Sequence, residues 1–225
     1  MAINWNPKQN EKCLPPNRPL YSSQDVFQYR GWATGTPSTG ERETLKFIDR
    51  RIIPAHNLRV LHHGTGRNDL AIAISGLPRV ARFDSITIFP LEQAKATANG
   101  VPCCAVYVLD KHDKRTYLTA HGPYDIIVDV NIASFACCYF HLAQMMQIWI
   151  NRLLSPGGVI VTHSLGMKYH HSKSPVSPLM TDDLVSLAEH YSLTLLEPVQ
   201  GQFVFVKPGD FVPLKLEGDI PCCSR

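Results

Sequence analysis

The sequence predicts an α/β fold in which a doubly wound, mostly parallel, seven-stranded sheet ends with an antiparallel strand. Three observations lead to this prediction. Apolar runs alternate with helical patterns from about residue 58 to residue 163, a Gly-x-Gly turn joins the first run to the first helix, and two consecutive strand patterns follow the last helix. The chain has 225 residues, of which 44% are hydrophobic, and this suits one domain with a full core.

The first strand and helix enclose the most informative turn. An apolar run at 59–63 breaks at Gly64-Thr65-Gly66, and an amphipathic segment then continues through Ile74. Glycine permits positive φ and close approach of a ligand, and the start of the following helix offers free N–H groups. The element is therefore typical of a site for a nucleotide-like cofactor, although a plain strand-to-helix turn has the same pattern.

The middle of the chain continues in strand and helix order. A strand is expected at 85–89, and Pro90 then begins a helix through 92–96, where its missing N–H costs nothing. Strands are also expected at 105–109 and 124–130. Their apolar residues are too continuous for a strand that is open to water on one face, so both are predicted to be central.

The last part of the sheet is predicted from a long helix and three strands. An apolar helix is expected at 135–154, ending at the segment Ser155-Pro156-Gly157-Gly158, with a strand at 159–163 after it. A helix at 181–190 precedes strands at 192–196 and 202–206, which are joined by a turn at Gln200-Gly201.

Residues 1–54 are expected to form an N-terminal extension that ends in a helix, residues 55–207 the α/β domain, and residues 208–225 a C-terminal tail. Ser38 and Glu41 resemble a capping box that begins a helix through about Ile53, and Pro54 ends it. The aromatic and glycine-rich segment 27–37 suits a lid or a binding wall, or a simple attachment of the extension to the domain.

Composition limits the function classes. The formal charge of +3 is too small to indicate nucleic-acid binding, and no apolar run has the length of a signal peptide or of a membrane span. Seven cysteines, six of them in adjacent pairs, suggest reduced thiols in the cytoplasm. Without a Cys-x-x-Cys spacing we expect no metal site and treat the pairs at 103–104 and 137–138 as small core residues; a metal cluster of all three pairs is the alternative.

With these elements in this order, the chain resembles the class I S-adenosylmethionine-dependent methyltransferases over residues 55–207. The resemblance is carried by the glycine turn at 64–66, by the run Tyr-Asp-Ile-Ile-Val-Asp at 124–129, and by Leu-Leu-Ser-Pro-Gly-Gly-Val-Ile-Val at 153–161. It implies a Rossmann-like methyltransferase fold, S-adenosylmethionine as the cofactor, and a leading segment that covers the cofactor.

The sequence departs from the family pattern at its acidic positions. His62 stands where an acidic residue usually precedes the first glycine, and Asn68 stands where a third glycine is usual. The carboxylate that would accept both ribose hydroxyls at the end of the second strand is replaced by Phe89 and Pro90. Asp84 and Glu92 flank that strand and could substitute if the strand register is shifted.

Ligands in open α/β sheets lie outside the carboxyl ends of the strands, and this rule selects the candidate site residues. We expect Asp129 and His163 to be catalytic, the carboxylate orienting an acceptor and the imidazole taking its proton; a helix cap and a core imidazole are the alternatives. The expected cofactor-binding residues are His63, Gly64, Thr65, Gly66, Phe89, Asp110 and Asp129. The loop 166–178, with Tyr169, His170 and His171, is expected to face the substrate.

Two function classes remain open. The first is methyl transfer from S-adenosylmethionine to an oxygen or nitrogen atom of a small-molecule acceptor. The second is a methyltransferase-like domain without methyl transfer, either running other chemistry on a related ligand or serving as a structural or assembly subunit. No membrane partner is expected, and a homo-oligomer is compatible with either class.

Overall fold

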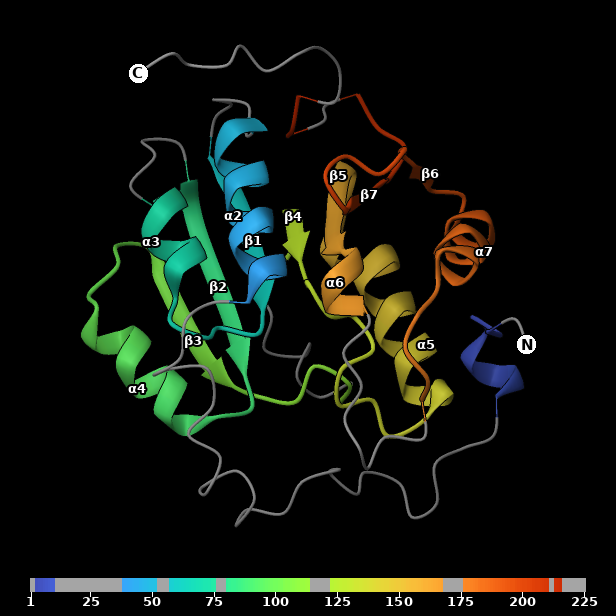
Figure 1. Cartoon of the computed structure of the whole chain (residues 1–225), viewed down its shortest axis with the longest axis horizontal. Coiled ribbons are helices and arrows are strands. Elements are labelled where there is room, and N and C mark those ends of the chain that lie inside the picture. The colour runs from blue at the N-terminus through green and yellow to red at the C-terminus, as the bar shows by residue number, and fades with distance from the viewer. Residues whose placement is uncertain are drawn as a thin grey trace.

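The structure is a computed structural model that describes residues 3–10, 38–51, 57–75, 80–113, 122–167, 176–210 and 213–215. Figure 1 shows how the elements are arranged around one sheet. Its strands are β1 (Leu58–His63), β2 (Val80–Thr87), β3 (Cys104–Val108), β4 (Tyr124–Val128), β5 (Leu154–His163), β6 (Thr194–Leu195) and β7 (Gln202–Val206). Its helices are η1 (Pro7–Gln9), α2 (Thr39–Arg51), α3 (Asp69–Ser75), α4 (Pro90–Ala98), α5 (Tyr139–Ile148), the π-helical η4 (Trp149–Leu153), α6 (Ser164–Met167) and α7 (Thr181–Tyr191).

The seven strands form one sheet in the order β3-β2-β1-β4-β5-β7-β6. Strands β1 to β5 pair in parallel, and β7 pairs antiparallel with both β5 and β6. The predicted fold class is therefore confirmed, including the antiparallel last strand. Of the two strands predicted to be central, β4 is central, but β3 lies at the edge of the sheet and its residues are only partly buried, so that part of the prediction was wrong. Because the chain moves from β1 outward to β2 and β3 and then returns to β4 on the other side, the switch point of the sheet lies between β1 and β4.

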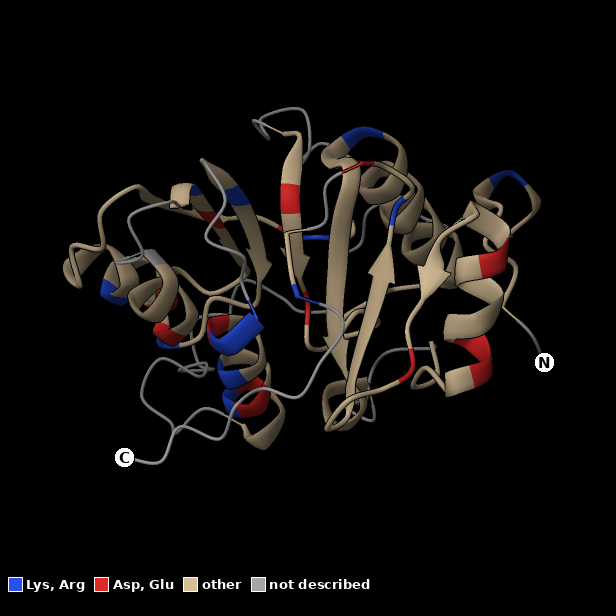
Figure 2. Cartoon of the chain, turned by 90° about the horizontal axis from the view of Figure 1, so that it is seen from above, with Lys and Arg blue, Asp and Glu red and all other residues tan. Residues whose placement is uncertain are grey.

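Both faces of the central strands are buried, and alternate residues of one strand pack into two hydrophobic clusters on opposite faces of the sheet. Val60 packs with residues of α2 and α3, whereas its neighbour Leu61 packs with residues of α5 and α7. The same alternation separates Val159 from Ile160 on β5. Helices accordingly lie on both sides of the sheet in Figure 2, and charges of both signs are interspersed along α2. This double burial explains the continuous apolar runs of the central strands.

Several predicted boundaries move. The helix predicted at 135–154 begins at Tyr139, because residues 131–135 form turns and Phe135 has a φ of 61°. Its last turn widens into η4, and β5 then begins at Leu154 instead of residue 159. The segment 155–158 still interrupts the ladder, because Tyr124 pairs with Leu154 while Ile126 pairs with Val159. Strand β2 begins at Val80, five residues before the predicted start.

The capping box at the start of α2 is confirmed. The Ser38 N–H donates to Glu41 Oε2 at 2.7 Å, and the Glu41 N–H donates to Ser38 Oγ at 3.2 Å. The helix ends at Arg51, and residues 52–56 lie outside the described part of the chain, as do the predicted lid 27–37 and the histidines of loop 166–178. Within the described residues, no helix is long and apolar enough to cross a membrane.

Candidate functional site

A cavity of about 250 Å³ lies at the carboxyl ends of β1, β2 and β4, at the switch point of the sheet. Its wall includes five of the residues predicted to bind a cofactor, namely His63, Gly64, Phe89, Asp110 and Asp129. The start of α2 closes one side through residues 38–41, and Leu165 and Gly166 close another. The strand-end rule therefore brings together residues that are up to 66 positions apart in the sequence, His63 and Asp129.

The glycine turn forms part of this cavity only through its first residue. Gly64 has a φ of 87°, and a Cβ built on it would have no atom within 4 Å. This open space beside the backbone is what close approach of a ligand requires. Thr65 and Gly66 instead line a smaller adjacent hollow of about 40 Å³ between the turn and α2.

Glu92 is the acid nearest the end of β2, and it reaches that position from the first turn of α4. Its side chain is 1% exposed, and its Oε2 accepts the Thr87 hydroxyl at 2.6 Å and the Gly66 N–H at 3.2 Å. The carboxylate therefore ties the end of β2 to the glycine turn. This substitution was predicted only for a shifted strand register, and β2 does end at Thr87 instead of residue 89.

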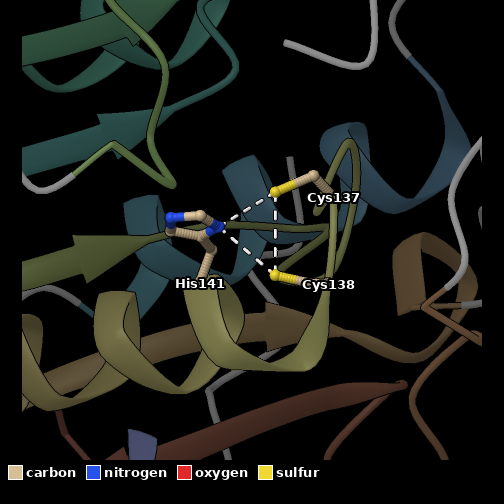
Figure 3. Close-up of side chains that lie close together, drawn as sticks. All are labelled: Cys137, Cys138 and His141. Carbon is tan, nitrogen blue, oxygen red and sulfur yellow. Dashed lines mark hydrogen bonds between the residues drawn. The ribbon is translucent and has the colours of Figure 1, made fainter. Parts of the chain in front are cut away.

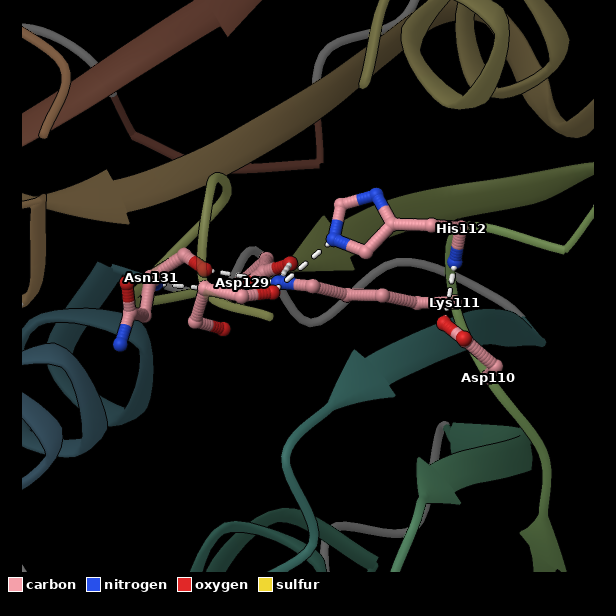
Figure 4. Close-up of polar contacts among 6 residues, drawn as sticks. Asp110, Lys111, His112, Asp129 and Asn131 are labelled. Atoms are coloured by element: carbon pink, nitrogen blue, oxygen red, sulfur yellow. Dashed lines mark hydrogen bonds and ion pairs between the residues drawn. The ribbon is translucent and has the colours of Figure 1, made fainter. Parts of the chain in front are cut away.

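A buried ion pair occupies the end of β4 (Figure 4). The Lys111 ammonium donates to Asp129 Oδ2 at 2.6 Å and to the Asn131 carbonyl at 2.7 Å, while Asp129 Oδ1 accepts the Asn131 N–H at 2.9 Å. Burial raises the pKa of Asp129 and lowers the pKa of Lys111, and their mutual attraction opposes both shifts. Lys111 was not predicted as a site residue, because nothing in the sequence marks a lysine two positions after a strand pattern.

Two imidazoles in the wall of the cavity, His62 and His63, and a third on the neighbouring His112 are held neutral. Burial lowers the pKa of His62 to about 4, and burial followed by the Lys111 charge lowers the pKa of His112 to about 3. His63 stacks on Trp149 with ring centroids 4.4 Å apart, and burial sets its pKa well below the ordinary value. His62, which replaces the usual acid of this position, therefore brings no charge to the cavity.

Asp110 follows β3 and stands in the wall of the cavity. Its Oδ1 accepts the His112 N–H at 2.8 Å, and burial raises its pKa. The site thus contains two carboxyl groups with raised pKa values, Asp110 and Asp129, and one ammonium with a lowered pKa. Such opposed shifts in one cavity are frequent at functional sites.

His163 ends β5 but does not line the cavity. Its side chain is 1% exposed, its Nε2 lies 2.8 Å from Glu43 Oε2, and its Nδ1 accepts the Leu165 N–H at 3.0 Å. Gly40 and Gly201 pack on either side of the ring so closely that an added Cβ would lie 3.2 Å from Nδ1 and 3.0 Å from Nε2, respectively. Both ring nitrogens are engaged, and this geometry suits a core imidazole better than a general base.

The cysteines are less buried than expected. Cys103 is exposed, and Cys104, Cys137 and Cys138 are half-buried, so none of these four is a core residue. Cys137 and Cys138 precede α5 and converge on one ring (Figure 3): their sulfurs lie 3.0 Å and 3.3 Å from His141 Nδ1. The hydrogen bond from Cys137, followed by that from His141, lowers the pKa of Cys138 to about 4, and its partner Cys138 raises the pKa of His141.

Comparison with known proteins identifies the fold. No family model and no curated protein sequence matches the chain. Among solved structures, the N-methyltransferase NodS from Bradyrhizobium japonicum WM9 in complex with S-adenosyl-L-homocysteine aligns with a TM-score of 0.57 and 15% identity, over 85% of this chain and 95% of NodS. An O-methyltransferase family protein from Burkholderia thailandensis aligns with a TM-score of 0.57 and 11% identity, over 75% of this chain and 56% of that protein. The chain therefore has the Rossmann-like fold of the class I S-adenosylmethionine-dependent methyltransferases.

Proposed function

We propose that the chain binds S-adenosylmethionine in the switch-point cavity and transfers its methyl group to an oxygen or nitrogen atom of a small-molecule acceptor. The observation that carries the proposal is the coincidence of three features at one place: the open backbone of Gly64, the cavity beside it, and the carboxyl groups of Asp110 and Asp129 in its wall. The solved structure of NodS with S-adenosyl-L-homocysteine supports the choice of ligand through its shared fold.

The residues of the cavity suit the parts of this cofactor. Phe89 and Phe135, whose rings meet edge to face with centroids 6.3 Å apart, offer an apolar wall for a base. The turn at Gly64 offers backbone close to the ligand, and Glu92, which also lines the cavity, holds the turn through the Gly66 N–H. Asp110 and Asp129 supply oxygen acceptors, and the Lys111 ammonium supplies a donor for a carboxylate.

The bound cofactor would supply an activated methyl group, and the chain would supply alignment. Lys111 and the Asn131 N–H hold the Asp129 carboxylate from two directions, so its position does not depend on the ligand. Burial keeps this carboxylate and the neighbouring imidazoles out of water. The role of the chain is then to exclude water and to bring the acceptor in line with the methyl group.

A second candidate is a methyltransferase-like domain that binds a related ligand without transferring a methyl group. The observation that favours it is the residue before the glycine turn: the neutral His62 stands where the resemblance leads us to expect an acid, so this position brings no negative charge to the cavity.

A binding experiment separates the two candidates. The reduced full chain is titrated calorimetrically with S-adenosylmethionine and with S-adenosylhomocysteine, and methyl transfer is then followed with a labelled methyl group over panels of hydroxyl and amine acceptors. Binding with a dissociation constant below about 100 µM, followed by labelling of an acceptor, is the expected result. A folded protein that binds neither compound would reject the proposal in favour of the second candidate.

A further inference from the structure

We propose that Cys137, Cys138 and His141 form a binding site for a thiophilic divalent cation of the zinc type. This triad lies at the start of α5, outside the switch-point cavity, and nothing in the proposed methyl transfer uses it. The inference is independent of the proposed function, because an ion could bind here whether or not the cavity binds S-adenosylmethionine.

The local structure explains why the three side chains converge. His141 is the third residue of α5 and Cys138 is the N-cap, and the side chains at these two positions lie close together at a helix start. Cys138 is the N-cap of α5, with extended backbone at φ −174° and ψ 163°. The chain therefore turns immediately before the helix and brings the Cys137 sulfur back to the same ring.

The donor distances are close to those around a tetrahedral ion. The two sulfurs are 3.8 Å apart and lie 3.0 Å and 3.3 Å from Nδ1 (Figure 3). An ion with metal–sulfur bonds of about 2.3 Å and a metal–nitrogen bond of about 2.0 Å requires edges of about 3.8 Å and about 3.5 Å. The sulfur pair already has the required spacing, and the ring must withdraw by only a few tenths of an ångström.

An ion satisfies this arrangement better than hydrogen bonds do. The Nδ1 atom offers one hydrogen-bonding direction in either tautomer, yet two sulfurs approach it, so at most one of these contacts can be a well-directed hydrogen bond. A cation at the common focus bonds to all three donors at once. Binding replaces the proton on Nδ1 and any thiol proton, which pass to solvent.

The surroundings suit a cation as well. The charges of Asp110 and Asp113 act on His141 in the direction that favours a positive charge there. The set of two sulfurs and one imidazole favours zinc over magnesium or calcium, which prefer oxygen. Within the described residues the triad supplies three ligands, and a tetrahedral ion would have its fourth position for water or an external ligand.

Cobalt titration tests the site, because tetrahedral Co²⁺ bound to thiolate has visible ligand-field bands and a near-ultraviolet sulfur-to-metal band. The full chain is reduced, stripped of metal with a chelator and titrated with Co²⁺, which Zn²⁺ then displaces. We expect one ion per chain with a spectrum of tetrahedral thiolate coordination. Cys137→Ser, Cys138→Ser and His141→Ala should each weaken binding about a hundredfold or more.

The chain provides a matched control in its other described cysteine pair. Cys103 and Cys104 are also adjacent, but the residue three positions after Cys104 is Tyr107 and no histidine faces them at helical spacing. The double variant Cys103→Ser/Cys104→Ser should keep the full spectrum, and a Cys222→Ser/Cys223→Ser variant should do the same. Circular dichroism of each variant checks that the fold is retained.

A second measurement on the unaltered chain makes the test independent of variant folding. Zn²⁺ should protect Cys137 and Cys138 from alkylation, read by peptide mass spectrometry, while Cys103 stays reactive. Equal alkylation of Cys137 with and without Zn²⁺, or a cobalt spectrum that survives Cys137→Ser/Cys138→Ser, would overturn the proposal. Either result would identify the triad as a hydrogen-bonded thiolate and imidazole group without metal affinity.

Discussion

The ends of β4 and β5 differ sharply, although the two strands are neighbours and parallel. Asp129 follows β4 and stands in the wall of the cavity, paired with Lys111. His163 ends β5 and is enclosed between Gly40 and Gly201, with Glu43 of α2 on its Nε2. The strand-end rule selects both residues equally. Only Asp129 lines the cavity, because residues of α2 pack against His163.

Topology alone therefore does not determine which strand-end residues form the cavity. Gly40 of α2 allows this helix to approach the end of β5 closely, because an added Cβ there would lie 3.2 Å from His163 Nδ1. At β4 the chain instead turns away through 131–135, and Asp129 faces the cavity. Whether a strand-end residue reaches the cavity thus depends on how closely the covering helix, which belongs to another part of the chain, packs over it.

The largest expected effect is at the end of β4. Lys111→Met should lower the free energy of unfolding by about 3–5 kcal/mol, because the buried Asp129 carboxylate loses its counter-charge. Urea denaturation at neutral pH measures this change. The double variant Lys111→Met/Asp129→Asn should recover a large part of the loss, since it removes both charges together.

The end of β5 supplies the comparison for that experiment. Glu43 is paired with His163 but its side chain is 42% exposed, so Glu43→Gln should change the free energy of unfolding by less than about 1 kcal/mol. Equal losses of unfolding free energy from Lys111→Met and Glu43→Gln would show that burial does not make the ion pair at β4 more important for stability than the pair at β5.

Much of the fold could be predicted from the sequence, because the sheet is buried on both faces. The apolar runs at 59–63 and 124–128 had no competing interpretation, and each forms a central strand. Boundaries were less predictable where the backbone departs from regular geometry. Phe135 adopts positive φ and delays α5, and nothing in an aromatic side chain signals this.

The site was predictable only in part, since its strand-end residues follow from topology while its charges come from loops and helices. Asp129, Asp110, Phe89 and Gly64 were selected by their positions after strands, and all line the cavity. Lys111 and the Cys-Cys-x-x-His group at 137–141 were missed. The second has a signal for Cys138 and His141, because an N-cap residue and the third residue of a helix lie close together, whereas the position of Cys137 depends on the extended backbone of Cys138.

The next effect concerns the glycine turn. Gly64→Val should weaken binding of S-adenosylhomocysteine about a hundredfold, near 2.7 kcal/mol, because a β-branched residue resists positive φ and its side chain fills the space beside the ligand. Gly100→Val is the matched control: Gly100 has a φ of 61° and open space around its Cβ position, but it lies after α4 away from the cavity. Calorimetry should find unchanged affinity for the control, and equal losses would attribute the effect to backbone strain alone.

A smaller effect concerns the neutral imidazole on β1. The folded His62 has a pKa of about 4, whereas the unfolded chain takes up this proton below about 6.5. The contribution of His62 to stability is therefore fully present above about pH 6.5. It declines as the pH falls toward 4, because the unfolded state binds more protons. Between pH 7 and pH 5 the decline should be about 2 kcal/mol smaller in His62→Asn than in the unaltered chain, measured by urea denaturation. The control is His190→Gln, at an exposed position, in which the decline should match that of the unaltered chain. If the decline in His62→Asn also matched that of the unaltered chain, the neutral state of the buried His62 ring would be contradicted.

The smallest effect is expected at the end of β5, and it decides between two roles for His163. As a general base, this residue would give the pH–rate profile of turnover an acid limb that His163→Ala lacks.

The geometry does not favour this role for His163. Both ring nitrogens are bonded within the protein, to Glu43 and to the Leu165 N–H, and the ring does not line the cavity. We therefore expect His163→Ala to keep methyl transfer within about threefold of the parent, equivalent to under about 0.7 kcal/mol of barrier, at every pH tested. Asp129→Asn, one strand away, should lower turnover more than it weakens S-adenosylhomocysteine binding. A loss of tenfold or more in His163→Ala, together with loss of the acid limb, would mean that α2 moves away from β5 during turnover and that the two strand ends act together after all.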